Sequence, residues 1–494
     1  MLENLEKPTN PTRDEYEGRL PSLRTSLLNT QFDLRQAPFP VLILLAGNDF
    51  IGCNAMVNLL HEWMDARYVK TRVFGRPTEE ERERPRFWRY WNVLPANGQI
   101  GLYVGAWPQA AIADRGLGRI SRASFEQRLD HIARFENTLV DQGALVLKFW
   151  LQIPKKELRK RVERAQKDPD RNWRVGENEF TIYENWSRFL PLAERLLKHS
   201  QDGLAPWQVI HSSRERHRNL EVAETIQARI QQRLESPATS PPPNPPAAAA
   251  AEPASCAPDG ALGQVDLSSS LHREKYQRAL AKQQRKLRKL SLLARTKRVS
   301  SVLVFEGWDA AGKGGAIRRI TGALEAADYR IVPIAAPSEE ELSHHYLWRF
   351  WRHLPRAGHM LIFDRSWYGR VLVERVEGFA SQEAWTKAYD EIRDFEGQLT
   401  DHGIPVVKFW LHIDPDTQLE RFQERERTPY KKYKITDDDY RNRGRWNEYC
   451  LAIEEMVERT STERAPWHII PANDKRFARI EVLKQVCAAL GRVT

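Results

Sequence analysis

The chain has few cysteines and no long hydrophobic run, and both features narrow the class of protein to which it can belong. Its 494 residues include four scattered cysteines, which form no metal-site spacing and are expected to be reduced thiols (Cys53, Cys256, Cys450 and Cys487). Without a run of about 18 apolar residues, no membrane-spanning helix is predicted. The N-terminal stretch is too polar for a signal peptide, so the cytoplasm is the expected location.

The chain also has fewer acidic than basic residues. The sequence has 76 Lys and Arg against 66 Asp and Glu, a formal net charge of +10. This excess predicts an acidic partner, such as nucleic acid, a membrane surface or another polyanion. No signature of an RNA- or DNA-binding module is present, which ranks a nucleic-acid-binding function low. With 41% hydrophobic and 29% charged residues, the chain is expected to be globular, with two or three domains.

The sequence is a tandem repeat with a constant offset of 260 residues. The landmark pairs, aligned without gaps, are Phe87–Pro95 with Leu347–Pro355, Leu147–Ile153 with Val407–Ile413, and Ala205–Ile210 with Ala465–Ile470. A Pro/Ala-rich stretch between the repeats cannot bury a core and is predicted to be an extended linker. We therefore expect an N-terminal domain over residues 1–235, a linker over 236–265 and a C-terminal domain over 266–494.

A phosphate-binding loop is predicted between Ser301 and Thr321. After the apolar run Val302–Phe305, Gly307, Gly312 and Lys313 fit the spacing G-x-x-x-x-G-K. Backbone N–H groups and the N-terminus of the following helix would hold phosphate oxygens, and Lys313 would add positive charge.

The usual metal-binding Ser or Thr after the lysine is replaced by Gly314. Asp309 is then the nearest carboxylate, and an acid beside phosphate suggests a metal ligand or a base. A turn-forming aspartate is an equally good interpretation of this residue alone.

A second candidate segment is Leu361–Gly378. Asp364 ends an apolar strand, where a Walker-B aspartate holds Mg²⁺, and Arg365 follows it as a possible phosphate ligand. Glu374, ten residues beyond Asp364, could complete the metal shell.

A third segment, Asp416–Trp446, is rich in arginine. Arg421 and Arg425 share one helix face through their i, i+4 spacing. Three lysines follow them: Lys431, Lys432 and Lys434. Such a segment is typical of a lid that closes over phosphates and excludes water. The alternative is a solvated charged hairpin.

Strands and helices alternate through the second repeat. The expected strands are Ser301–Glu306, Tyr329–Pro333, Met360–Asp364, Pro405–His412 and Trp467–Pro471, and helices are expected to begin near Lys313, Ser338, Ser381, Asp416 and Arg476. Ser338 and Glu341 form a capping box. This alternation predicts a parallel sheet covered on both faces, with ligands at the carboxyl ends of the strands.

A strongly basic helix is expected before this sheet, within Leu271–Arg298. Leu280, Leu287, Leu290 and Leu293 suggest an apolar stripe on it. A solvated surface is the favoured interpretation of its charges, and a binding surface for a polyanion is the alternative.

The first repeat lacks the charged groups of these segments. Its glycines and aspartate align with the second repeat, so the loop is expected to remain without its charge. The substitutions are Cys53 for Lys313, Val104 for Asp364 and Gly105 for Arg365, whereas Arg161 keeps the place of Arg421. We therefore expect the first repeat to be catalytically silent and to act in packing, stability or binding.

Four segments together resemble the polyphosphate kinase 2 family: GWDAAGKGG, FDRSWYGRVLVERV, KFWLHI and RFQERER…KKYKITDDDYRNR. The duplicated layout resembles the two-domain class of that family. The resemblance implies an α/β fold in which a P-loop kinase domain similar to thymidylate kinase is duplicated in tandem. Each domain would have three αβα layers, a parallel sheet and a helical lid. It also implies Mg²⁺-dependent, in-line transfer of the terminal phosphate of inorganic polyphosphate to AMP, giving ADP.

The resemblance also implies roles for individual residues. Asp309 would activate the acceptor phosphate through metal, and Lys313 would bind phosphate with Arg365, Arg421 and Arg425. The implied metal ligands are Asp309, Asp364 and Glu374. The other implied phosphate- or nucleotide-binding positions are Gly307, Ala310, Ala311, Gly312, Gly314, Gly315, Arg318, Lys431, Lys432 and Lys434. One departure is Ala316, where the family often has Thr.

Three alternatives remain beside this interpretation. They are a polyphosphate-dependent nucleoside diphosphate kinase, an ATP-dependent kinase on the same fold, and a nucleic-acid-binding protein. The expected partners are polyphosphate and AMP or ADP, with neither nucleic acid nor a membrane. Assembly into a homo-oligomer is left open, since a tandem repeat can mimic a symmetric dimer.

Overall fold

The computed structural model describes residues 2–167, 181–182, 184–235, 256, 259–428 and 437–493. The chain divides into two compact units. The first comprises Met1–Pro77, Arg89–Thr239 and Ser338–His345, and the second comprises Thr78–Trp88, Ser240–Pro337 and Tyr346–Thr494.

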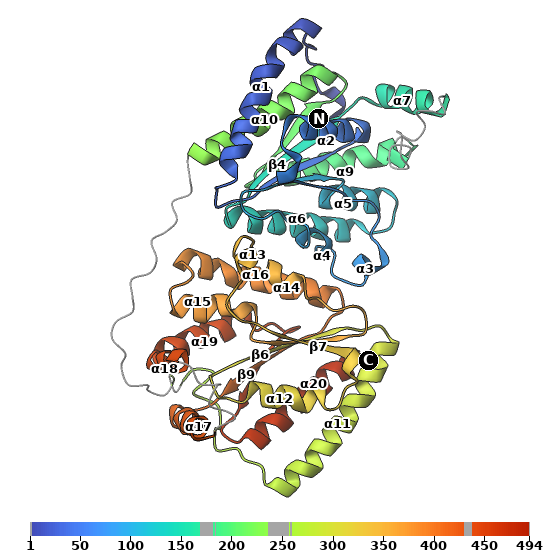
Figure 1. Ribbon diagram of the computed structural model, residues 1–494. Helices are drawn as coiled ribbons and strands as arrows, with labels where there is room; N and C mark the ends of the chain where they lie inside the picture. The colour runs from blue at the N-terminus through green and yellow to red at the C-terminus, as the bar shows by residue number, and fades with distance from the viewer. Residues whose placement is uncertain are drawn as a thin grey trace. The chain divides into compact units, whose positions relative to one another are not determined.

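The first repeat contains a five-stranded parallel sheet in the order β2-β3-β1-β4-β5 (Figure 1). Its strands are β1 (Val41–Gly47), β2 (Val69–Val73), β3 (Ile100–Val104), β4 (Leu145–Gln152) and β5 (Trp207–His211). The central strand β1 pairs with β3 and β4 and is buried along its whole length. An uninterrupted apolar run is what a strand covered on both faces requires.

Two groups of helices cover this sheet. The helices of the first repeat are η1 (Leu2–Asn4), α1 (Arg13–Leu34), α2 (Phe50–Trp63), η2 (Ala66–Tyr68), α3 (Glu79–Arg82), α4 (Trp88–Trp91), α5 (Trp107–Gly116), α6 (Arg122–Asp141), α7 (Lys155–Lys167), α9 (Trp186–His199) and α10 (Glu215–Glu235). Helices α1, α2 and α10 pack together on one face, and α5 packs with α6 and α9 on the other (Figure 1).

The second repeat has the same topology, with a parallel sheet in the order β7-β8-β6-β9-β10. Its strands are β6 (Ser301–Gly307), β7 (Tyr329–Pro333), β8 (Met360–Asp364), β9 (Val406–His412) and β10 (Trp467–Pro471). The five strands expected from the sequence are confirmed, and no boundary is wrong by more than one residue. Two α/β domains with parallel sheets confirm the predicted fold class.

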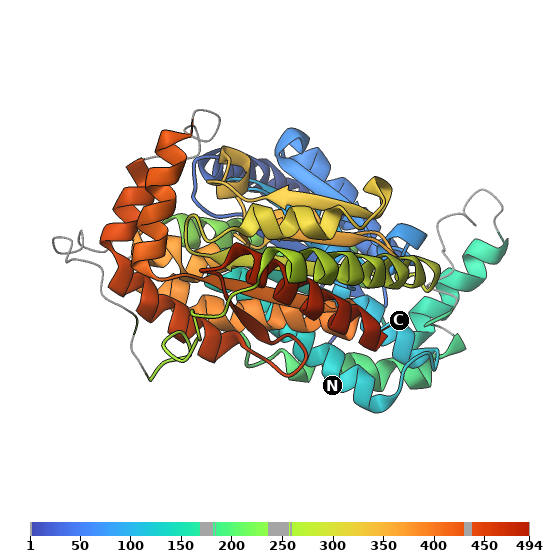
Figure 2. The ribbon, with the colours of Figure 1, turned by 90° about the horizontal axis from the view of Figure 1, so that it is seen from below.

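The helices of the second repeat also form three layers with the sheet. They are α11 (Arg273–Thr296), α12 (Lys313–Thr321), η4 (Ala326–Asp328), α13 (Glu339–Leu342), α14 (Trp348–Trp351), η5 (Trp367–Val371), α15 (Val373–Val376), α16 (Gln382–Asp401), α17 (Pro415–Arg427), α18 (Asp437–Gly444), α19 (Trp446–Thr460) and α20 (Lys475–Val493). Helices α11, α12 and α20 pack together, and α16 packs with α19 and η5 on the opposite face (Figures 1 and 2). The predicted capping box of Ser338 and Glu341 is present. None of the helices in the described ranges is long and apolar enough to cross a membrane.

The cysteines correct one expectation. Cys256 and Cys450 form a disulfide, so the prediction of four reduced thiols is wrong for this pair, whereas Cys53 and Cys487 are buried thiols outside any disulfide of the described residues. The bonded residues are 194 positions apart, and no local spacing could reveal that the last part of the predicted linker returns to α19. The adjacent backbone is fixed there as well, because the N–H groups of two residues donate to the Glu454 carboxylate (Ala261 and Leu262).

Candidate active site

The turn between β6 and α12 is held open in a strained shape at the carboxyl edge of the sheet. Gly307 has φ of 147°, and a Cβ there would lie 2.6 Å from the carbonyl oxygen of Leu411, so only glycine fits. Gly312, with φ of 109°, directly precedes α12. Ala310 has φ of 64°, a left-handed conformation that costs a residue with a Cβ on the order of 1 kcal/mol. The turn leaves the N-terminus of α12 open to an anion.

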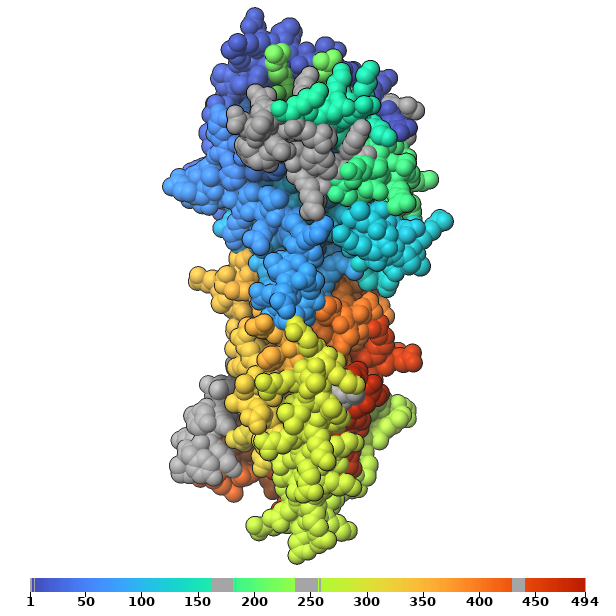
Figure 3. Space-filling view, turned by 90° about the vertical axis from the view of Figure 1, so that its right-hand side faces the viewer, coloured from blue at the N-terminus to red at the C-terminus, as the bar shows by residue number. Residues whose placement is uncertain are grey.

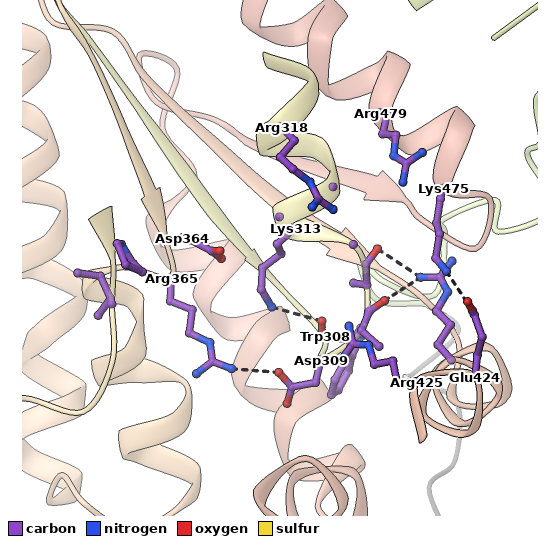
Figure 4. Close-up of a pocket in the computed structure, with 18 residues that line it drawn as sticks. Trp308, Asp309, Lys313, Arg318, Asp364, Arg365, Glu424, Arg425, Lys475 and Arg479 are labelled. Carbon is purple, nitrogen blue, oxygen red and sulfur yellow. Dashed lines mark hydrogen bonds and ion pairs between the residues drawn. The ribbon is translucent and has the colours of Figure 1, made fainter. Parts of the chain in front are cut away.

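A pocket of about 860 Å³ lies over this turn (Figure 4). Its lining includes seven lysine and arginine side chains (Lys313, Arg318, Arg365, Arg421, Arg425, Lys475 and Arg479). Only three carboxylates oppose them (Asp309, Asp364 and Glu424). A concave site with this excess of positive charge favours a polyanion. The predicted backbone positions Ala310, Ala311, Gly312, Gly314 and Gly315 also line it.

Lys313 points into this pocket from the first residue of α12 (Figure 4). Its ammonium donates to the carbonyl oxygens of Gly307 at 2.6 Å and Trp308 at 3.3 Å. Burial lowers the pKa of Lys313, although the nearby charge of Asp309 acts in the opposite direction. The lysine is therefore held by its own loop, within the same pocket as Asp309 and Asp364.

An ion pair between Asp309 and Arg365 connects the segments that follow β6 and β8. Arg365 Nη2 lies 3.1 Å from Asp309 Oδ1, and the side-chain amide of Asn442 donates to Asp309 Oδ2 at 3.2 Å. The Arg365 N–H donates to the Phe305 carbonyl oxygen at 3.0 Å, and its φ is 67°. Glycine would adopt this φ without strain. The position has an arginine instead, and its side chain extends into the pocket.

The carboxylates of Asp309 and Asp364 are the metal-ligand candidates inside the pocket. In the described part of the chain, no group of three or more His, Cys, Asp or Glu side chains could hold a metal ion. Two carboxylates still fit Mg²⁺, which is usually held by one or two of them together with substrate phosphates and water. Glu374 does not line the pocket, and its carboxylate pairs with Arg370 at 3.1 Å. Its role as a metal ligand stays a prediction.

Arg421 lines the pocket, but its guanidinium is bound by backbone carbonyl groups. Its buried guanidinium donates to four carbonyl oxygens, those of Ala310, Ala311, Ala472 and Asn473, at 2.7 to 3.3 Å. Burial, with the nearby charge of Arg425, lowers the pKa of Arg421 to about 10. In this arrangement Arg421 positions the loop, and its contact with phosphate stays a prediction. Arg425 lines the pocket one helical turn later, whereas the predicted lysines Lys431, Lys432 and Lys434 lie outside the described residues.

A second, smaller hollow of about 100 Å³ adjoins the first. It shares Trp308, Asp309 and Arg365 with the basic pocket, and Gly307 also lines it. The rest of its lining is mainly apolar or aromatic, with two amides (Gly369, Leu372, Val373, Trp410, Tyr449, Gln418, Asn442 and Glu306). The two hollows meet at Asp309 and Arg365.

Sequence reasoning missed several residues of this site. Glu306, at the end of β6, accepts a hydrogen bond from Ser366 Oγ at 2.8 Å, and burial raises its pKa against the charge of Lys313. Lys475 and Arg479, in the first turns of α20, line the basic pocket. The sequence did contain signals for these residues. Glu306 closes an apolar strand, and Lys475 and Arg479 follow the carboxyl end of another strand.

Trp308 was also missed, although it lies inside the predicted motif. Its ring stacks on Trp446, the first residue of α19, with centroids 3.6 Å apart and planes 5° from parallel. Its indole Nε1 donates to Nδ1 of the buried His412 at 3.1 Å. The stack joins the loop to the helix that follows α18.

A glycine-rich loop before a helix, a strand-end aspartate and an arginine-lined pocket define the class of P-loop phosphotransferases. Comparison places the chain more narrowly: the profile of the family described as polyphosphate kinase 2 matches residues 10–237 and 270–493. The chain belongs to the polyphosphate kinase 2 family, and each repeat is one copy of its domain.

Relatives over nearly the whole length agree with this membership. A polyphosphate:AMP phosphotransferase of Pseudomonas aeruginosa is 46% identical over 99% of this chain and 98% of its own. One from Acinetobacter johnsonii is 35% identical over 91% and 90%. A crystal structure from Pseudomonas aeruginosa, described as polyphosphate kinase 2, has a TM-score of 0.89 and 44% identity over 100% of this chain and 99% of that one.

Proposed function

We propose that this protein is a polyphosphate:AMP phosphotransferase, which moves the terminal phosphate of inorganic polyphosphate to AMP and gives ADP. The observation that carries the proposal is the basic pocket over the loop. Seven cations against three carboxylates suit a donor made of repeated phosphates, which offers no base or sugar to recognise.

The two hollows suit the two substrates. The basic pocket takes the polyphosphate chain, and the smaller hollow, lined by Trp410, Tyr449 and Leu372, takes the nucleoside of AMP. Their shared residues Asp309 and Arg365 then face the junction where the acceptor phosphate meets the terminal phosphorus. An oxygen of AMP attacks that phosphorus in line, and the shortened polyphosphate leaves.

Charge neutralisation and positioning account for the catalysis. Lys313 and Arg365 offset the charge that spreads over the transferring phosphoryl oxygens, and Arg421 fixes the loop that orients them. Asp309 and Asp364 would hold Mg²⁺, which when bound supplies further neutralisation between the two substrates.

Only the second repeat, within residues 266–494, performs this chemistry in our proposal. The first repeat has Cys53 where the loop lysine stands, and Val104 and Gly105 where Asp364 and Arg365 stand. Residues 1–235 then contribute to packing, stability or binding, and residues 236–265 link the two domains.

The test supplies the purified protein with AMP, Mg²⁺ and long-chain polyphosphate and omits ATP. ADP formation is the expected result, and a reaction without polyphosphate is the control. ADP that forms only when ATP is added would instead identify an ATP-dependent kinase. Comparing AMP with ADP and GMP as acceptors then distinguishes this activity from a nucleoside diphosphate kinase.

A further inference from the structure

Helix α11 presents a stripe of positive charge that the catalytic pocket does not include. The stripe consists of Lys275, Arg278, Lys282, Arg285, Lys286 and Lys289. All six side chains are exposed, and successive positions are three or four residues apart, or adjacent, so they lie on one face of the helix. In Figure 3 the yellow-green residues of α11 lie on the surface turned to the viewer. The opposite face is buried through Tyr276, Leu287 and Ala294.

These charges are not neutralised by their surroundings. Within the described residues, only Arg278 of the six has a carboxylate within ion-pair distance. That partner is Glu274, the single acid of the helix, at 3.8 Å, and both side chains are more than 80% exposed. Such a pair is weak in water. A helix that only needed solubility would be expected to mix both signs of charge.

The length of α11 is sufficient for its N-terminal end to reach the edge of the sheet where the pocket opens. Its last residue, Thr296, precedes β6 by a few residues, which places its C-terminal end at the amino edge of the strands. Its 24 residues span about 36 Å, which is enough to reach the carboxyl edge.

Contacts join α11 to the two helices that supply the outer cations of the pocket. Gln284 Nε2 donates to the Arg319 carbonyl oxygen on α12 at 2.9 Å, and Cys487 Sγ on α20 donates to the Gln283 carbonyl oxygen at 3.7 Å. Arg318 on α12 and Arg479 on α20 point toward the same side of the pocket (Figure 4).

The first repeat provides an internal control. Its helix α1 keeps the apolar positions of α11, with Tyr16 at Tyr276 and Leu27 at Leu287. At the six stripe positions, however, it has no cation: the aligned residues are Glu15, Gly18, Ser22, Thr25, Ser26 and Asn29. The positive stripe is therefore present only in the repeat that has the loop lysine. Packing alone does not explain it, because α1 packs on α10 and α2 as α11 packs on α20 and α12.

We infer that the exposed face of α11 binds the distal part of a long polyphosphate chain whose terminal phosphates occupy the pocket. This inference rests on the proposed function. The stripe from Lys275 to Lys289 covers about 21 Å, room for several phosphate units beyond the pocket. Lysines along one face suit a substrate without fixed geometry, since each acts as a mobile point charge. Such contacts should raise affinity for long chains and leave the chemical step unchanged.

The test is the triple variant Lys275→Gln, Lys282→Gln and Lys289→Gln. Its control is Lys155→Gln, Lys156→Gln and Lys160→Gln, which removes the same charge from three exposed lysines of α7. In the stripe variant we expect the KM for long-chain polyphosphate to rise about ten-fold, with kcat unchanged. Inhibition by tripolyphosphate, which is short enough for the pocket of about 860 Å³ to hold alone, should stay as in the parent protein. The slope of log KM against log salt should fall by about two units.

Three outcomes would overturn the inference. They are an unchanged KM for the long chain, an equal loss for tripolyphosphate, and an equal loss in the α7 control. A stripe variant that loses binding to a DNA duplex but keeps its KM for polyphosphate would assign the face to nucleic acid instead. If the parent protein makes no ADP from AMP and polyphosphate, the proposed function itself fails, which is a separate result.

Discussion

The aligned aspartates of the two repeats, Asp49 and Asp309, have different roles. In the first repeat the helix after the strand begins at Phe50, so residues aligned with the phosphate-binding loop form its first turn. Asp49 caps this turn by accepting from the Gly52 N–H at 2.8 Å, and Ser212 Oγ also donates to it. The expectation that the loop remains in the first repeat without its charge is therefore wrong.

In the second repeat the equivalent residues keep the loop open. Trp308 replaces Asn48, which in the first repeat binds the backbone of Ile153 in both directions. Ala472 replaces Ser212 and removes the hydroxyl that held the aspartate. Asp309 instead faces Arg365 and Asn442. The comparison shows that the residues around the aspartate determine whether it caps a helix or faces the site.

The largest expected effect separates the loop lysine from its counterpart. Lys313→Ala removes the positive charge at the transferring phosphoryl group, so kcat for ADP formation should fall by a factor on the order of 10² or more. Cys53→Ala, at the aligned position, should leave kcat unchanged. Steady-state kinetics at saturating AMP and polyphosphate measures both, and thermal unfolding checks that each variant is folded. Equal losses would show that the first repeat takes part in the chemistry.

A second prediction uses Arg365 and its counterpart Gly105, which have nearly the same φ, 67° and 63°. Arg365→Gly should reduce kcat at least ten-fold, since one phosphate-neutralising group is lost. Arg365→Ala should reduce kcat equally but keep the left-handed strain. The glycine variant should therefore have a free energy of unfolding about 1 kcal/mol above that of the alanine variant, measured by urea denaturation. Equal stabilities would mean that this backbone is not strained.

A third prediction concerns pH. Burial lowers the pKa of His412 to about 4, so the folded protein keeps this imidazole neutral. An unfolded histidine titrates near 6.5, and stability should therefore be complete above that pH and fall as the pH drops toward 4. The loss should approach about 3 kcal/mol at its acid limit.

The first repeat supplies the control for this titration. It has Gln152 at the aligned position, where Gln152 Oε1 accepts from the Trp150 indole at 3.0 Å. His412→Gln can accept from Trp308 in the same manner without titrating. Urea denaturation between pH 7 and the acid limit should show a flatter profile for this variant, and parallel profiles would contradict the assignment.

Much of the second repeat could be predicted because its signals are local. The strands are short apolar runs, and Gly307, Gly312 and Lys313 are spaced within one turn and helix start. The site was more difficult because its geometry depends on distant segments. The predicted phosphate ligand Arg421 contacts Ala310 across 111 residues and Ala472 across 51, and no spacing shows that these carbonyls occupy its guanidinium.

Buried polar groups were the other limit. Lys408, inside an apolar strand, forms an ion pair with Glu396 at 2.7 Å, and both side chains are almost fully buried. The first repeat keeps the pair as Lys148 and Glu136 at 2.5 Å. A lysine in a strand gives no indication of its partner, which lies on a helix. Because both repeats have the pair, it belongs to the fold, whereas groups present in one repeat mark the site.

The smallest expected effect tests the cap directly. Asp49→Asn keeps an oxygen to accept from Gly52 and adds an amide that can donate to the Ser212 hydroxyl, so stability should change by only a few tenths of a kcal/mol. Asp49→Ala loses the cap and should destabilise the first unit by about 1 kcal/mol, with kcat unchanged. Asp309→Asn should instead reduce kcat while leaving stability nearly intact, because Asp309 holds no helix end. A loss of turnover in Asp49→Asn without a change in stability would show that the first aspartate has kept a catalytic role.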